Sequence, residues 1–198
     1  PYGKYETRTI CAAYLAHANT VLRFSGLQSR DEAEAKASLL HCVAGYFDFE
    51  GKWSYAEKLS TEAVKIRDGL LGPDHPSTLT SMNNLASTYT NQGRLEEAVK
   101  LFVQVMETCK IKLGADHPST LTSMGNLASI YRNQSRWEEA EKQEVQVMET
   151  RKTKLGPDHP DTLTSMNNLA FTWKRQGRHD DALALMDVVR STICIGLS

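Results

Sequence analysis

A unit of forty-two residues, repeated three times in succession, constrains this chain more than any other feature. The copies that begin at Leu71 and Leu113 are identical at 31 of their 42 positions, and a third copy begins at Leu155. A diverged copy precedes them. Such a period is typical of repeat architectures, in which each repeat buries its apolar face against its neighbours. The sequence therefore predicts a stacked array, and such arrays form extended binding surfaces more often than catalytic pockets.

Glycine and proline mark the helix boundaries of each unit and predict two helices within it. In the second repeat Gly72 suits the end of a helix, and Pro76 suits the first turn of the next, where its missing N–H is not needed. His75 precedes this proline and is pushed out of the helical region, so no helix runs through it. Apolar residues at three- and four-residue spacing then predict a first helix over about 77–91 and a second over about 95–112.

The same pattern divides the whole chain and predicts an all-α fold, an α-solenoid of antiparallel helix pairs with about four repeats and an N-terminal helix. Residues 1–31 are expected to form a cap or the end of an upstream unit, with a helix over 8–24. The array is expected over 32–198, with repeats at about 32–70, 71–112, 113–154 and 155–198. Helices are expected over about 32–49 and 53–70 in the first repeat, and over 161–175 and 179–195 in the last.

Alanine recurs at two positions of every repeat, which indicates close packing of the paired helices. Helix axes approach to about 8–10 Å only where the side chains between them are small. One row lies on the first helix of each repeat and the other on the second. The two rows are Ala44, Ala86, Ala128 and Ala170, and Ala56, Ala98, Ala140 and Ala182.

These positions resemble the signature of the tetratricopeptide repeat, carried in the second repeat by Leu85, Ala86, Tyr89, Ala98 and Phe102. The usual tetratricopeptide repeat has 34 residues. The longer unit here is similar to the kinesin light chain type. The segment LGPDHPxTLTSMNNLA is also similar to the C-terminal repeats of fungal NLR-like NTPases of the STAND class. In those proteins the repeats lie downstream of a nucleotide-binding domain and serve as a sensor. The chain has no GxxxxGK[ST] motif, so we expect no NTPase activity from this piece.

Composition argues against several other classes of protein. The formal net charge is -1, which speaks against an indiscriminate nucleic-acid binder, and no apolar run approaches a membrane span. The four cysteines are scattered without a CxxC pair and are expected to be reduced thiols of a cytoplasmic protein. No signal-peptide pattern opens the chain, which begins at Pro1 without a Met. We therefore expect a piece of a larger protein.

Histidines recur beside Asp and Pro in the links between repeats, at His75, His117 and His159. Ligands of one metal ion lie within about 2.2 Å of it, whereas equivalent residues of successive repeats lie about 10 Å apart. These histidines are therefore predicted to cap helices rather than to bind metal. No nucleophile is paired with a base in the sequence, and we expect neither catalysis nor a cofactor.

The resemblance implies a concave groove lined by the first helix of each repeat, and it carries a set of candidate binding residues over by position. Asparagines there suit the backbone of an extended peptide. The basic residues of the later repeats would make that half of the groove positive, beside one apolar contact. We expect a protein or peptide ligand with acidic and apolar side chains; the alternative is that these are merely solvated helix-face residues. The set is Thr80, Asn83, Ser87, Asn91, Arg132, Asn133, Asn167, Phe171, Lys174 and Arg175.

The third repeat departs from its neighbours. Ser135 stands where the other repeats have glycine in the turn between helices, which would be strained if the turn needs a left-handed residue. Gln143 and Glu144 replace Leu101 and Phe102. We expect the second helix of this repeat either to have a wetter outer face or to meet another surface there.

The end of the chain leaves alternative functions open. Residues 193–197 are apolar where earlier copies are charged, which indicates that the array continues beyond Ser198 or that this end docks on a partner. The leading interpretation is a protein-interaction module. The alternatives are an assembly element that self-associates through the ends of the solenoid, and a regulatory region of a larger enzyme.

Overall fold

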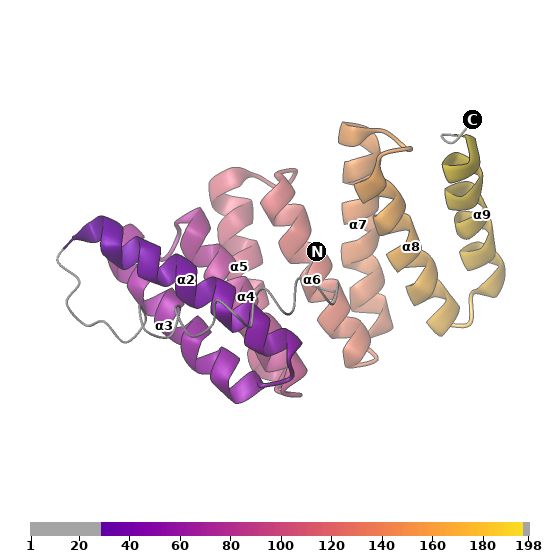
Figure 1. Ribbon diagram of the computed structural model, residues 1–198. Coiled ribbons are helices and arrows are strands. Elements are labelled where there is room, and N and C mark those ends of the chain that lie inside the picture. The colour runs from indigo at the N-terminus through magenta and orange to yellow at the C-terminus, as the bar shows by residue number, and fades with distance from the viewer. Residues whose placement is uncertain (1–28, 196–198) are drawn as a thin grey trace. The chain divides into compact units, whose positions relative to one another are not determined.

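The computed structural model describes residues 29–195, with side chains through Thr192, and every regular element in that range is an α-helix. The first helix of each repeat, here called an A helix, is followed by a short turn and a second helix, the B helix (Figure 1). The A helices are α2 (Arg30–Phe49), α4 (Pro76–Asn91), α6 (Pro118–Asn133) and α8 (Pro160–Arg175). The B helices are α3 (Trp53–Leu71), α5 (Leu95–Leu113), α7 (Trp137–Leu155) and α9 (His179–Ile195).

The predicted all-α solenoid of helix pairs is confirmed, and the helix bounds agree with the expected ones to within two residues. The link histidines cap the A helices, as predicted. In each link the histidine is extended, and its Nδ1 accepts a hydrogen bond from the backbone N–H two residues later, at 3.2 Å for His75 and 3.1 Å for His117 and His159. The helix expected over 8–24 lies outside the described residues.

The chain divides into two compact units, one ending at Val105 and the other beginning at Met106, within α5. In the first unit α3 packs between α2 and α4. In the second, α7 packs against α6 and α8, and α8 against α9. Within each unit these neighbouring helices therefore cover one another, as the repeat requires.

The alanine rows lie at the centre of this packing. All eight alanines are buried, with exposures between 0% and 3%. In the first unit Ala56 packs with Val43 and Phe47. In the second unit Met148 of α7, Met166 and Leu169 of α8 and Val189 of α9 form one cluster, so three helices share a core.

Ser135 is the one non-glycine residue with a positive φ among the described residues, at 59°. Its equivalents Gly51, Gly93 and Gly177 have φ of 74°, 78° and 85°. The left-handed conformation costs a residue with a Cβ roughly 1 kcal/mol relative to glycine. The turn therefore does need a left-handed residue, and Ser135 is strained.

Replacing Ser135 with glycine is expected to stabilise the protein by up to about 1 kcal/mol, because glycine adopts this φ without steric cost. The change is measured as the shift of the urea unfolding curve followed by circular dichroism. The reverse substitution, Gly177→Ser, provides the matched control and is expected to destabilise by a similar amount. A Ser135→Gly variant no more stable than the parent would remove the strain argument.

Candidate binding surface on the A helices

In the first unit the predicted residues of α4 are partly occupied by bonds within the protein. The hydroxyl of Thr80 donates to the carbonyl of Pro76 at 2.9 Å, and that of Ser87 donates to the carbonyl of Asn83 at 3.0 Å. The amide of Asn91 donates to the carboxylate of Asp48 on α2 at 2.7 Å. This part of the surface is therefore polar but largely satisfied by its own partners.

Asn83 is the predicted residue of this unit with unused hydrogen-bonding capacity. It is half-buried, and its Oδ1 is shielded from solvent without a hydrogen-bond partner among the described residues. The next residue, Asn84, is the one that reaches α2, where its amide nitrogen contacts the His41 ring at 3.1 Å. Burial, with a smaller contribution from the nearby Arg67 charge, lowers the pKa of His41, so the ring is neutral near pH 7.

In the second unit the predicted residues of α8 are open to solvent. Phe171 is 50% exposed, and Asn167, Lys174 and Arg175 are exposed as well. Because residues three and four apart share a helix face, Lys174 and Arg175 lie one turn beyond Phe171. Asn133 is exposed at the end of α6. This surface combines one apolar ring with two cations and two amides.

Arg132 was expected to be a cation of this surface, but it is paired inside the protein. Its Nη1 donates to Oε1 of Glu144 at 2.6 Å, and its side chain is only 17% exposed. Its guanidinium also lies 5.5 Å from the centre of the Phe171 ring. Because its charge is neutralised by Glu144, Arg132 supports Phe171 and does not offer a free cation to a ligand.

The expectation of a wetter outer face at Glu144 is wrong, and the surface that meets this residue is that of α8 in the same chain. The residue is 4% exposed. Its second oxygen accepts a hydrogen bond from the hydroxyl of Thr172 at 2.6 Å, so one carboxylate on α7 joins α6 to α8. Burial raises the pKa of Glu144, against the opposing effect of its two donors. The polar residue is thus part of the interior of the second unit.

A second set of polar contacts, which the sequence did not suggest, ties B helices to the A–B turn of the following repeat. Glu57 of α3 accepts hydrogen bonds from Gln92 and Arg94, both at 2.8 Å, and these bonds hold its pKa below the ordinary value. Glu141 of α7 accepts from Trp173, Gln176 and Arg178 at 2.7, 2.9 and 2.7 Å. Glu57 and Glu141 are two periods apart, so a comparison of alternate repeats could have found them.

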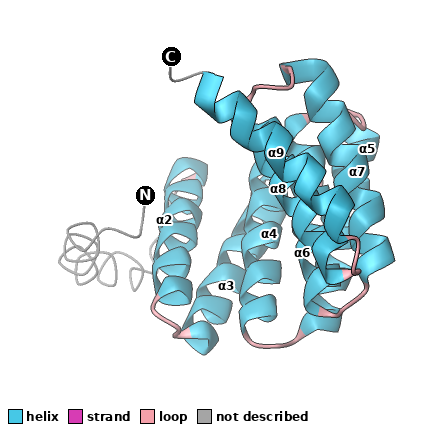
Figure 2. Ribbon diagram, turned by 90° about the vertical axis from the view of Figure 1, so that its right-hand side faces the viewer, coloured by secondary structure: helices cyan, strands magenta, loops and turns pink. Residues whose placement is uncertain are grey.

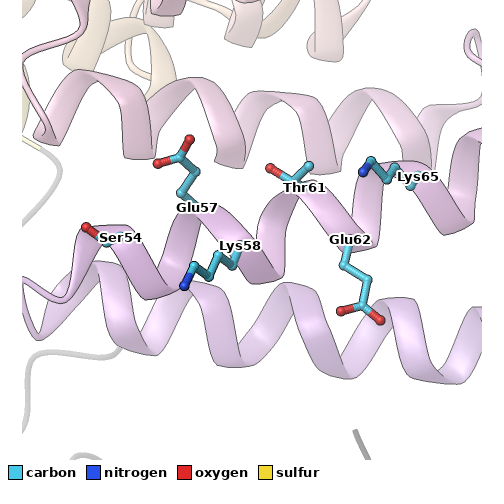
Figure 3. Close-up of a pocket in the computed structure, with 6 residues that line it drawn as sticks. All are labelled: Ser54, Glu57, Lys58, Thr61, Glu62 and Lys65. Carbon is cyan, nitrogen blue, oxygen red and sulfur yellow. The ribbon is translucent and has the colours of Figure 1, made fainter. Parts of the chain in front are cut away.

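A shallow hollow of about 530 Å³ lies along α3. Figure 3 shows Glu57 pointing toward one neighbouring helix and Glu62 toward the other, where Glu62 pairs with Lys36 of α2 at 2.8 Å. All its lining residues come from this one helix, and they carry charges of both signs: Ser54, Glu57, Lys58, Thr61, Glu62 and Lys65. Such a mixed surface has no convergent set of groups and resembles an ordinary solvated helix face.

In the part of the chain that the structure describes, no group of three or more His, Cys, Asp or Glu residues could hold a metal ion. No helix among residues 29–195 is long and apolar enough to cross a membrane.

Comparison with known families identifies the repeat. The tetratricopeptide repeat family matches residues 36–110 and 81–153, and a further match covers residues 162–193. These matches span most of the chain, which therefore belongs to the tetratricopeptide repeat family. Tetratricopeptide repeats are protein–protein interaction scaffolds, and the fold is a non-catalytic repeat module.

Individual relatives are consistent with this assignment. A nucleotide-binding leucine-rich repeat (NLR)-like protein of Hyaloscypha variabilis is 43% identical over 83 residues, a stretch that covers 42% of this chain and 8% of that protein. The chain thus spans less than a tenth of that relative.

Solved structures show the same fold. The putative kinesin light chain of Podosopora anserina, with nearly identical TPR-like repeats, has a TM-score of 0.78 at 26% identity, over 98% of this chain and 91% of that one. BtubC (BKLC) from P. vanneervenii has a TM-score of 0.78 at 18% identity, over 98% of this chain and 76% of that one, which shows the fold alone.

Proposed function

We propose that this chain is a peptide-binding module whose recognition surface lies on α8 and the end of α6, and that it takes extended segments with acidic and apolar side chains. One observation carries the proposal. Phe171 is half exposed beside the exposed cations Lys174 and Arg175, whereas the candidate residues of α4 are mostly engaged within the protein. The amides of Asn133 and Asn167 would bond the peptide backbone, since an amide both donates and accepts.

The chemistry of this surface favours one class of ligand. An apolar side chain gains by covering the Phe171 ring, which lies 5.5 Å from the guanidinium of Arg132, itself paired with Glu144. A carboxylate within a few ångströms of Lys174 or Arg175 is attracted by about 1 kcal/mol or more, depending on how much water is excluded. The guanidinium of Arg175 also lies 5.4 Å from the centre of the Trp137 ring, a cation–π contact. Binding is therefore expected to weaken as salt rises.

The double substitution Lys174→Glu with Arg175→Glu is expected to weaken binding of a fluorescein-labelled peptide of alternating glutamate and leucine by about tenfold or more. Fluorescence anisotropy at two salt concentrations measures the dissociation constant of the peptide, with a lysine–leucine peptide as the charge control. Lys142→Glu with Lys152→Glu on α7 changes the net charge equally away from the surface, and should leave binding unchanged. Equal binding by the two double variants would contradict the proposal.

We further propose that the parent protein is an NLR-like receptor and that these repeats are its sensing region. The support is the NLR-like relative, which is 43% identical over 83 residues. If this is right, the gene encodes a nucleotide-binding domain with a GxxxxGK[ST] motif upstream of Pro1. A gene without that motif would contradict this part of the proposal but not peptide binding.

Self-association through the ends of the array is the alternative function. One observation favours it: large apolar side chains on α9 are exposed, namely Leu183, Met186 and Val188. Light scattering across a concentration series separates the two readings, because only an assembly element grows in mass as it is concentrated.

A further inference from the structure

Asp48, near the end of α2, carries a charge that no described residue of the first unit cancels. Its Oδ2 accepts a hydrogen bond from the amide of Asn91 on α4 at 2.7 Å. Its Oδ1 is shielded from solvent and has no hydrogen-bond partner among the described residues. Because Asn91 is neutral, it satisfies one oxygen of the carboxylate without cancelling the charge. α2 contacts both α3 and α4, and Figure 2 shows the three helices side by side, so the two helices that bound this site are both present.

The equivalent position of the second unit shows what Asp48 lacks. Arg132 stands two periods after Asp48, and its charge is cancelled by Glu144 of α7, with the two atoms 2.6 Å apart. At the position of Glu144 the first unit has Ser60, which is 2% exposed and carries no charge. The second unit therefore neutralises this position from its own B helix, whereas the first unit does not.

The other titratable groups on the face of α2 that meets α4 are balanced or neutral. Glu34 pairs with Arg67 at 2.9 Å. Burial, with a smaller contribution from the nearby Arg67 charge, lowers the pKa of His41, so its ring adds no charge near pH 7. The opposing helix contributes none either, because α4 has no charged residue between Pro76 and Asn91. The uncompensated charge of this face is therefore the carboxylate of Asp48.

Gly45 leaves room for a ligand beside this carboxylate. It is exposed on α2, and a Cβ added to it would meet no atom within 4 Å. Residues three and four apart share a helix face, so Asp48 and Phe49 lie one turn beyond Gly45. The Phe49 ring is 57% exposed. The hydrogen bond from Asn91 to Asp48 is itself exposed, and the terminal torsion of an aspartate is broad, so the carboxylate can turn toward a donor from solvent.

We propose that Asp48, Phe49 and the open position at Gly45 form a subsite for a basic side chain, lysine or arginine, of a peptide ligand. Charge complementarity selects this occupant, since a lone carboxylate repels acidic side chains and is left without a donor by apolar ones. The cationic group meets Asp48 and the exposed face of Phe49, and its aliphatic stem lies over Gly45. The subsite lies within the first unit and does not depend on the surface of α8.

Two short peptides test this subsite on the full chain labelled with 15N. One is acetyl-Ala-Ala-Lys-Ala-Ala-amide, and the other has norleucine in place of lysine, which keeps the alkyl chain and removes the charge. Amide shifts are expected to concentrate in residues 41–49 and 84–91. The lysine peptide is expected to bind at least about fivefold more tightly than its norleucine twin. Equal binding of the two peptides, or shifts that lie outside α2 and α4, would overturn the proposal.

Removing the charge of Asp48 tests its role directly. Asp48→Asn keeps an oxygen for the Asn91 amide and is expected to weaken binding of the lysine peptide at least about fivefold, with little effect on the norleucine peptide. Asp31→Asn removes the same charge from an exposed position at the start of α2 and should leave the dissociation constant unchanged. A dissociation constant for Asp48→Asn equal to that of the parent would refute the role of the carboxylate.

Filling the open position tests the shape of the subsite with its charge intact. Gly45→Leu is expected to abolish the shifts in α2, because the added side chain occupies the space of the ligand stem. Gly69→Leu, at an exposed glycine of α3 with equal room, is the matched control and should bind the lysine peptide as the parent does. Lys174→Glu with Arg175→Glu should leave the α2 shifts unchanged, which separates this site from the surface on α8. Circular dichroism confirms that each variant is folded, and undiminished binding by folded Gly45→Leu would contradict the proposal.

Discussion

Replacing Glu144 with alanine is expected to lower the free energy of unfolding around α7 by about 3 kcal/mol, the largest single effect in the second unit. The carboxylate is 5% exposed and accepts from Arg132 and Thr172 at 2.6 Å each. Removal of the carboxylate leaves two donors without an acceptor. One is the guanidinium of Arg132, whose side chain is 17% exposed, and the other is the fully buried hydroxyl of Thr172. The cost arises from these unpaired donors. Removing one partner of a buried ion pair destabilises a protein by more than the pair itself contributes to stability, because the remaining charge is left buried without a counter-charge.

Hydrogen exchange resolved to the amides of α7 and α8 measures this loss, because repeat arrays open locally rather than all at once. A loss of this size corresponds to roughly a hundredfold faster exchange of the most protected amides. Glu149→Ala, an exposed glutamate on the same helix, is the matched control and should change stability by less than about 0.5 kcal/mol. Equal exchange in the two variants would show that the buried pair is not holding the helices together.

The repeat period suggests apolar replacements for the three residues. Where the third repeat has Arg132 and Glu144, the second has Thr90 and Phe102, and Ile130 stands at the position of Thr172. The triple variant Arg132→Thr, Glu144→Phe, Thr172→Ile is therefore expected to recover most of the stability that Glu144→Ala loses, since apolar groups of similar volume often replace a buried ion pair without cost. If the triple variant is as unstable as Glu144→Ala, the loss of stability in Glu144→Ala comes from poorer packing and not from an unpaired buried charge.

The helices were predictable because their boundaries are set locally. Gly72 ends one helix, His75 is held extended by the proline after it, and Pro76 opens the next, all within a few residues and repeated in each link. The alanine rows followed from the period alone. Identical units are expected to fold alike, so each correct assignment in one repeat carried to the others.

The polar contacts between repeats were not predictable from the repeat considered by itself. Arg132 and Lys174 looked equivalent because they stand one period apart, yet one is bound to Glu144 and the other is exposed. The sequence signal for this pairing was that three positions differ together from their equivalents one period earlier. Arg132, Glu144 and Thr172 stand where the preceding unit has Thr90, Phe102 and Ile130. Asn91 is a similar case, because its partner Asp48 belongs to the diverged first repeat. Side chains that differ between repeats need their neighbours in space before a role can be assigned.

Replacing Arg67 with alanine is expected to destabilise the first unit by about 3 kcal/mol. Arg67 is 7% exposed, and its guanidinium pairs with Glu34 at 2.9 Å. It also donates to the hydroxyls of Ser38 and Ser81, both at 2.8 Å, so it links α2 and α4 from its place on α3. Its loss leaves Glu34, whose side chain is only 33% exposed, facing a cavity without its counter-charge.

Arg151 provides the comparison that isolates this charge effect. It stands two periods after Arg67 and bonds in the same way to the following A helix, to the hydroxyl of Ser165 at 2.8 Å and to the carbonyl of Asp161 at 3.3 Å. It has no equivalent of the Glu34 carboxylate, because Pro118 occupies that position. Arg151→Ala is therefore expected to cost only about 1 kcal/mol. Adding Glu34→Ala to Arg67→Ala should recover part of the larger loss, as a double-mutant cycle of hydrogen exchange in α2–α4 would measure. Equal losses at Arg67 and Arg151, or no coupling between Arg67 and Glu34, would show that the hydrogen bonds alone carry the interaction.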